Sequence, residues 1–250
     1  MTTWQNWAGN QIARGLTPSH AIVSNDDVVE VVEKARREKN RIKVVGTGHS
    51  FSGIARPEEV VVSLRNLSGI IRIDRESSTV VVRAGTTIAD LNIELHRHGL
   101  AMPNLGDVTY QSIAGALSTA THGTGLRLGG LATQVVGFTL LTADGEILEC
   151  SPTSNAEVWR HGRVSLGALG ILLDVTLKVV EKFSLHAVEQ AEPVEDVLEN
   201  WDRNMEENDH FEFYWIPHTR WALTKRNNRT SREHTQSRPV ATFWNKIVME

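Results

Sequence analysis

The sequence has a single cysteine among its 250 residues, Cys150. One cysteine excludes an intrachain disulfide and a zinc site built from several thiolates, so we expect Cys150 to be a small residue at the end of a strand. No run approaches the roughly 18 uninterrupted apolar residues of a membrane-spanning helix. Residues 1–10 also lack the basic-then-apolar pattern of a signal peptide. These absences favour a cytoplasmic protein without a membrane segment.

The chain also carries little net charge. Its 26 Lys and Arg residues are scattered among 30 Asp and Glu residues, which leaves a formal net charge of -4. A nucleic-acid-binding surface needs a basic patch or stripe, so no nucleic-acid partner is expected. No metal site is predicted either. Hydrophobic residues make up 40% of the chain, which is enough for the core of a globular protein.

What the sequence does contain is a glycine-rich loop after an apolar run. Residues 44–53 read Val-Val-Gly-Thr-Gly-His-Ser-Phe-Ser-Gly. Glycines let backbone N–H groups converge on an anion without interference from a Cβ atom, and Ser50 and Ser52 add hydroxyl donors. We therefore predict a phosphate-binding loop with His49 at its centre.

Two common phosphate loops do not match this segment. The Rossmann fingerprint requires a third glycine where this chain has Phe51. A Walker A loop requires Lys and then Ser or Thr after its last glycine, but Ile54 and Ala55 follow Gly53, which argues against a nucleotide hydrolase. Pro57 lies where either motif would be well inside a helix, so the loop is predicted to lead to another strand.

The hydrophobic pattern predicts an α+β fold. Ser24 and Asp27 form a capping-box pattern in front of apolar residues at helical spacing, and a β-α-β unit would deliver the glycine loop. A second helix is predicted at 87–98, ending at Gly99. Strands are predicted at 21–23, 42–45, 60–64, 69–74, 79–84, 134–142, 146–150 and 171–180.

A second distinctive segment, residues 106–125, consists mostly of Gly, Ala, Ser and Thr. So few bulky side chains let a backbone approach a flat ligand or another backbone closely, while the hydroxyl groups supply hydrogen bonds. A large cofactor would account for both properties.

The pattern is less regular after residue 180. Residues 181–204 are predicted to mix strand and helix, 211–216 to form a strand whose aromatic residues either pack a sheet or line a substrate site, and 221–225 to return as a hairpin. The polar and basic segment 226–238 is predicted to be a solvated loop. Residues 243–250 resemble the start of an apolar element, which predicts that the chain is a fragment.

Four motifs that follow one another in a fixed order along the chain carry a family resemblance. They are residues 46–52, residues 112–125 ending in Thr-His-Gly-Thr-Gly, residues 134–136 with 141–146, and residues 166–170. Together they resemble the PCMH-type FAD-binding domain of the vanillyl-alcohol oxidase superfamily, and within it the sugar-1,4-lactone oxidase group, which includes gulonolactone and arabinonolactone oxidases. The resemblance implies an FAD-binding domain of two α/β subdomains over residues 1–181, then an incomplete α+β substrate domain over 182–250.

The resemblance also implies which residues would hold FAD. The loop at 46–51 would bind the diphosphate, and His49 stands where many members bond a ring nitrogen to the flavin 8α-methyl group, although some relatives bind FAD without that bond. For His122, a structural contact with a backbone carbonyl is the alternative to packing against the flavin. The implied cofactor-binding residues are Gly46, Thr47, Gly48, His49, Ser50, Phe51, Ser112, Ala120, Thr121, His122, Gly123, Gly170 and Ile171.

The implied activity is oxidation of an aldono-1,4-lactone or related polyol by hydride transfer to flavin N5, with oxygen or a cytochrome-like protein as electron acceptor. The family's charged catalytic groups lie on the substrate domain and are not assigned to residues here. The alternative is a catalytically incomplete flavin-binding fragment without turnover.

Overall fold

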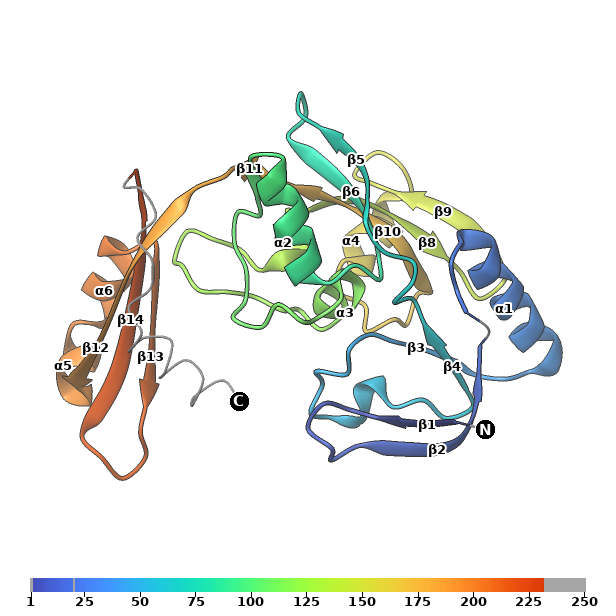
Figure 1. Cartoon of the computed structure of the whole chain (residues 1–250), viewed down its shortest axis with the longest axis horizontal. Coiled ribbons are helices and arrows are strands. Elements are labelled where there is room, and N and C mark those ends of the chain that lie inside the picture. The colour runs from blue at the N-terminus through green and yellow to red at the C-terminus, as the bar shows by residue number, and fades with distance from the viewer. Residues whose placement is uncertain (1, 20, 232–250) are drawn as a thin grey trace. The chain divides into compact units, whose positions relative to one another are not determined.

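The computed structural model describes residues 2–19 and 21–231 and divides the chain into two compact units, one ending at Lys182 and one starting at Phe183 (Figure 1). In the described part of the chain, no helix is long and apolar enough to cross a membrane. Each unit has a hydrophobic cluster of its own, one drawn from residues 22–179 and one from residues 194–222.

A four-stranded sheet in the first unit carries the glycine loop. Its strand order is β1-β2-β4-β3, with β2 and β3 parallel to β4 and β1 antiparallel to β2. The loop follows β3, as predicted, and leads through a short 3-10 turn, Gly53–Ala55, to β4. The strands are β1 (Thr2–Gln5), β2 (Ile12–Pro18), β3 (Ile42–Val45) and β4 (Val60–Ser63).

Helix α1, Asn25–Glu38, connects β2 to β3. The predicted capping box is present, because the Ser24 side chain accepts from the Asp27 N–H and the Asp27 carboxylate accepts from the Ser24 N–H. The strand predicted at 21–23 is wrong. The Val23 N–H also donates to the Asp27 carboxylate, so the helix cap turns this stretch out of the sheet, while Ile22 packs in the core.

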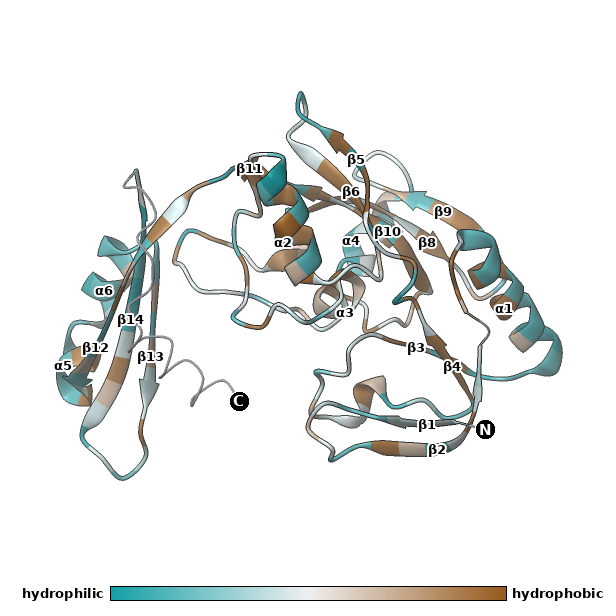
Figure 2. Ribbon diagram, in the orientation of Figure 1, coloured by the Kyte–Doolittle hydropathy of each residue, from teal (hydrophilic) through white to brown (hydrophobic). Residues whose placement is uncertain are grey.

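A five-stranded antiparallel sheet forms the rest of the first unit's framework, in the order β5-β6-β10-β8-β9. Strands β6, β8 and β10 are rich in hydrophobic residues (Figure 2), and this sheet contributes more buried residues to the core than the other sheets do. The strands are β5 (Ile70–Asp74), β6 (Thr79–Arg83), β8 (Val135–Leu141), β9 (Ile147–Cys150) and β10 (Ile171–Lys178). All five were predicted within two residues. Cys150 lies at the end of β9, as expected, and burial raises the pKa of its thiol.

Helices α2 (Ile88–Arg97), α3 (Ile113–Ser118) and α4 (Ala156–Gly162) complete this unit, with a 3-10 turn at Leu131–Gln134. Short strands β7 (Leu100–Ala101) and β11 (Val180–Glu181) pair antiparallel. Helix α2 matches its prediction, whereas α3, α4, β1, β2 and β7 were not predicted.

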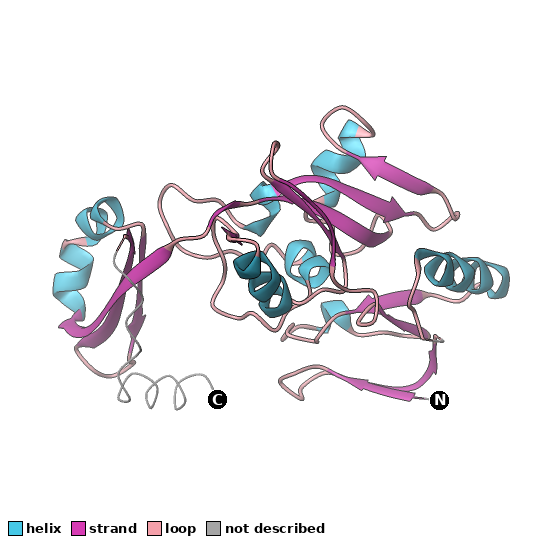
Figure 3. Ribbon diagram, turned by 45° about the horizontal axis from the view of Figure 1, so that its top comes forward, coloured by secondary structure: helices cyan, strands magenta, loops and turns pink. Residues whose placement is uncertain are grey.

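The second unit is a three-stranded antiparallel sheet, β12-β14-β13, with α5 and α6 on one face (Figure 3). Its strands are β12 (Ser184–Pro193), β13 (His210–Trp215) and β14 (Trp221–Thr230), and its helices are α5 (Val194–Glu199) and α6 (Trp201–Glu207). The predicted strand 211–216 and its hairpin return are therefore confirmed. Phe211 and Phe213 pack edge-on against Trp201 under α6, so these two aromatics serve sheet packing.

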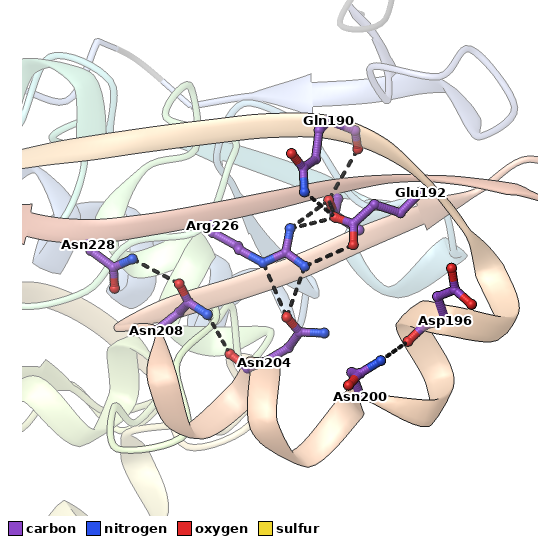
Figure 4. A network of polar contacts seen from close by, with 9 residues as sticks. Gln190, Glu192, Asp196, Asn200, Asn204, Asn208, Arg226 and Asn228 are labelled. Carbon is purple, nitrogen blue, oxygen red and sulfur yellow. Dashed lines mark hydrogen bonds and ion pairs between the residues drawn. The ribbon is translucent and has the colours of Figure 1, made fainter.

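The loop predicted at 226–238 is wrong at its start, because β14 continues to Thr230. Its polar residues belong to a hydrogen-bonded network under the helices (Figure 4). Arg226 donates two bonds to the Glu192 carboxylate, at 2.6 and 3.2 Å, and two to Asn204 Oδ1, at 3.1 and 2.9 Å. Thr224 and Gln190 also donate to Glu192. Residues 232–250, including the predicted element at 243–250, lie outside the described residues.

Candidate functional site

The first unit contains a cavity of about 590 Å³, within the range typical of small-molecule and cofactor sites. The glycine loop at 46–50 lines part of it. The other walls come from the end of β4 at 63–65, the start of α3, and the segments 141–143 and 165–172. Segments far apart in the sequence thus converge on one concave site.

At two glycines of the loop, the space or the backbone conformation disfavours any residue with a side chain. A Cβ atom at Gly46 would lie 2.6 Å from Ser112 Oγ, so glycine allows the loop to approach α3. Gly48 has a φ of +77°, in the left-handed region that favours glycine. The N–H groups of residues 47–51 donate no hydrogen bond to any other residue in the described ranges. They remain available for an anionic ligand.

Ser112 lies beside the loop and also lines the cavity. It is 7% exposed, its hydroxyl oxygen accepts from the Gly115 N–H at 3.3 Å, and it caps α3. The small residues Ala114, Gly115 and Ser118 also line the cavity, as the composition of this segment led us to expect. The wall is therefore low in side-chain bulk and rich in hydroxyl groups.

Gly170 and Ile171 also line the cavity. Gly170 has a φ of +145°, and a Cβ atom there would lie 2.3 Å from the Leu141 carbonyl oxygen. Ile171 begins β10 and is 9% exposed. The cavity thus brings together these predicted residues: Gly46, Thr47, Gly48, His49, Ser50, Ser112, Gly170 and Ile171.

The remaining predicted residues do not line this cavity. Phe51 points outward with 64% of its surface exposed. Ala120, Thr121, His122 and Gly123 follow the end of α3. An imidazole nitrogen of His122 lies 2.9 Å from the Gly123 carbonyl oxygen. Contact with a backbone carbonyl is the alternative to packing against the flavin for this histidine.

His49 lies between two aromatic rings. Its imidazole stacks on Trp7, with centroids 5.3 Å apart, and on Tyr110, with centroids 6.3 Å apart. Both partners are exposed over more than half of their surface. His49 therefore lines the cavity with its ring packed against two aromatic side chains.

The charge of the cavity was missed by sequence reasoning. Arg36, Lys43 and Arg65 line it, and no Asp or Glu is among the described residues that do. Three cations without a carboxylate suit an anionic ligand such as a diphosphate. Arg36 comes from the last turn of α1, Lys43 from β3 and Arg65 from the turn after β4, so no single segment of the sequence shows the three cations together. In the part of the chain that the structure describes, no three His, Cys, Asp or Glu residues are grouped to hold a metal ion.

A model of the FAD binding domain family matches residues 21–151, just over half of the chain. The chain belongs to this family. Its predicted cofactor, FAD, fits the glycine cradle, the free N–H groups and the cationic lining described above. A second model, D-arabinono-1,4-lactone oxidase, matches residues 175–250.

Curated relatives extend the similarity over nearly the whole chain. L-gulonolactone oxidase of Bos taurus is 39% identical, over 98% of this chain and 55% of its own length. L-gulono-1,4-lactone dehydrogenase of Mycobacterium tuberculosis is 36% identical, over 99% of this chain and 56% of its own length. D-arabinono-1,4-lactone oxidase of Eremothecium gossypii is 31% identical, over 96% of this chain and 46% of its own length. The resemblance to sugar-lactone oxidases is confirmed, and the chain spans about half the length of these relatives.

A solved structure shows the fold. Cholesterol oxidase from B. sterolicum superposes with a TM-score of 0.83 over 99% of this chain and 54% of that one, at 18% identity. Together with the family match, this confirms the predicted PCMH-type α+β fold.

Proposed function

We propose that this chain is the cofactor-binding part, with the beginning of the substrate domain, of an FAD-dependent oxidoreductase that acts on a CH–OH group of an aldono-1,4-lactone or related polyol. The observation that carries the proposal is the cavity: a glycine loop with free N–H groups, three cations and no carboxylate in its described lining. The names of the relatives support the substrate class.

The residues that line the cavity and residues 120–123 after α3, which do not line it, have separate proposed roles. The N–H groups of the 46–51 loop would bind the diphosphate, the Ser112 hydroxyl would contact the ligand beside it, and Gly170 and Ile171 would leave room for the adenine. Ala120, Thr121, His122 and Gly123 would line the isoalloxazine and ribityl chain. FAD, when bound, supplies the hydride acceptor at N5. The residues that orient the lactone are left unassigned.

The electron acceptor and the location complete the proposal. Oxygen or a cytochrome-like protein would reoxidise the flavin, and a cytoplasmic location is proposed from the sequence. Oxygen consumption, compared with reduction of cytochrome c, distinguishes the two acceptors, and cell fractionation tests the location.

The test is spectroscopic. Purified protein is reconstituted with FAD, freed of excess cofactor and examined in the visible range, and L-gulono-1,4-lactone is then added without oxygen. We expect a bound flavin spectrum that bleaches on addition of the lactone. A colourless protein contradicts the proposal, and a flavin spectrum that does not bleach favours the alternative of a flavin-binding fragment without turnover.

A further inference from the structure

The turn between β1 and β2 contains an asparagine whose side chain is almost fully enclosed. Asn6 is 3% exposed. Its amide donates to the Ser50 carbonyl at 2.8 Å and to Asn10 Oδ1 at 2.6 Å, and its own Oδ1 accepts from the Gln11 N–H at 2.9 Å. Both hydrogens and the oxygen of this amide are therefore in use.

The same turn binds three carbonyl groups of the glycine loop. Besides the bond from Asn6 to Ser50, the Trp7 N–H donates to the Gly48 carbonyl at 2.9 Å and Asn10 donates to the Phe51 carbonyl at 3.0 Å. The packing is close, because a Cβ atom at Gly48 would lie 3.3 Å from the Asn6 Cα. Figure 1 shows the β1–β2 turn beside the loop that follows β3.

These bonds determine which side of the loop is free. Three loop carbonyls are held against the turn, while the N–H groups of residues 47–51 donate to no described residue. A loop whose carbonyl oxygens are bound on one side can present its N–H groups to an anion without the repulsion of those oxygens. Trp7 adds its stack on His49.

We propose that the β1–β2 turn is part of the cofactor site, and that Asn6 is a positioning residue that holds the Gly46–Phe51 loop with its N–H groups available to the FAD diphosphate. This rests on the proposed function. Asparagine is required because the position needs two donors toward Ser50 and Asn10 and one acceptor toward Gln11. A carboxylate would place a negative oxygen against the Ser50 carbonyl, and an alanine would leave buried groups unpaired.

The experiment compares the affinities of the wild type, Asn6→Asp and Asn10→Asp for FAD and for ADP, which keeps the diphosphate but lacks the flavin. Affinity is measured by calorimetry on protein shown by circular dichroism and thermal unfolding to be folded. Arg14→Ala, an exposed change on β2 of the same hairpin, is the control. Asn10 is exposed, so its variant is expected to fold even if Asn6→Asp does not.

We expect Asn6→Asp to lower the affinity for both ligands by at least tenfold and Asn10→Asp to lower it by about threefold. Arg14→Ala should leave both affinities unchanged. A merely structural asparagine would lower the unfolding midpoint and leave the affinity of the folded fraction as it is. Wild-type affinity in the folded variants overturns this inference. If Asn6→Asp does not fold, Asn10→Asp alone decides. Failure of the wild type to bind FAD or ADP overturns the proposed function instead.

Discussion

His49 illustrates how much a single side chain in the loop can determine. Its imidazole stacks on Trp7 and on Tyr110, and the residue lines the cavity. A ring held in this way is suited to present one nitrogen in a fixed direction, as a bond to the flavin 8α-methyl group would require. Whether that bond forms is a prediction that chemistry on the intact polypeptide can test.

We predict that FAD stays attached to the wild-type polypeptide after acid precipitation and denaturing electrophoresis, and that His49→Ala abolishes the attached flavin. The readout is flavin fluorescence of the protein band under acid. His122→Ala is the matched control, since it removes an exposed imidazole from the other predicted flavin segment, and it should leave the fluorescence intact. A dark wild-type band that nevertheless binds FAD in its folded state indicates non-covalent binding.

Ala120 offers a test of backbone strain at the residue scale. It has a φ of +57°, and the left-handed region costs an L-residue with a Cβ atom roughly 1–2 kcal/mol. Ala120→Gly removes this cost but adds entropy to the unfolded chain, so we predict a gain of about 0.5–1 kcal/mol in the free energy of unfolding. Urea denaturation measures it.

The control for this change has the opposite sign. Ala116→Gly, inside α3 and fully buried, should lower the free energy of unfolding by about 1 kcal/mol. Equal destabilisation by both substitutions would contradict the strain at Ala120.

At the scale of elements, an ion pair between Arg226 and Glu192 links β14 to β12 in the second unit. The bonds from Arg226 lower the pKa of Glu192 to about 2, with Thr224 and Gln190 contributing, against the opposing effect of burial. A carboxyl group whose pKa falls on folding stabilises the protein above its unfolded pKa, near 4.5, and loses that contribution as pH falls toward 2.

We predict that Arg226→Ala lowers the free energy of unfolding of this unit by about 3 kcal/mol at pH 7, because it leaves a mostly buried carboxylate without its cation. The difference from the wild type should shrink between pH 4.5 and pH 2, as Glu192 takes up a proton in the wild type. Urea unfolding at several pH values measures both effects. Arg203→Ala breaks an exposed ion pair with Glu207 and should lower the free energy of unfolding by less than about 0.5 kcal/mol. If it costs as much as Arg226→Ala, the buried pair has no special role in stability.

Local patterns predicted the elements whose signals lie within a few residues of each other. The capping box of α1 and the apolar runs of β6 and β8 needed no distant partner to be recognised. The site depends on contacts between residues that lie far apart in the sequence. Asn6 acts on Ser50, 44 positions away, and the cations of the cavity come from three separate segments. Helix α3 was missed because its small residues give little hydrophobic periodicity, although three of these small residues line the cavity.

At the scale of the whole chain, the two hydrophobic clusters share no residue, and the cavity belongs entirely to the first unit. A ligand that binds only one unit stabilises that unit by mass action, by about 2.7 kcal/mol at 100 times its dissociation constant. For a unit of this size, that shift corresponds to roughly 5–10 °C in the unfolding midpoint.

We therefore predict that FAD raises the unfolding temperature of the first unit and leaves that of the second unchanged. Hydrogen exchange on heating can follow β8 and β10 in one unit and β13 and β14 in the other. Riboflavin at the same concentration is the matched ligand control, because it lacks the diphosphate that the loop and its cations would bind, and it should produce a smaller shift. If FAD moves both sets of strands by the same amount, the two units unfold as one, and the independence of their cores is contradicted.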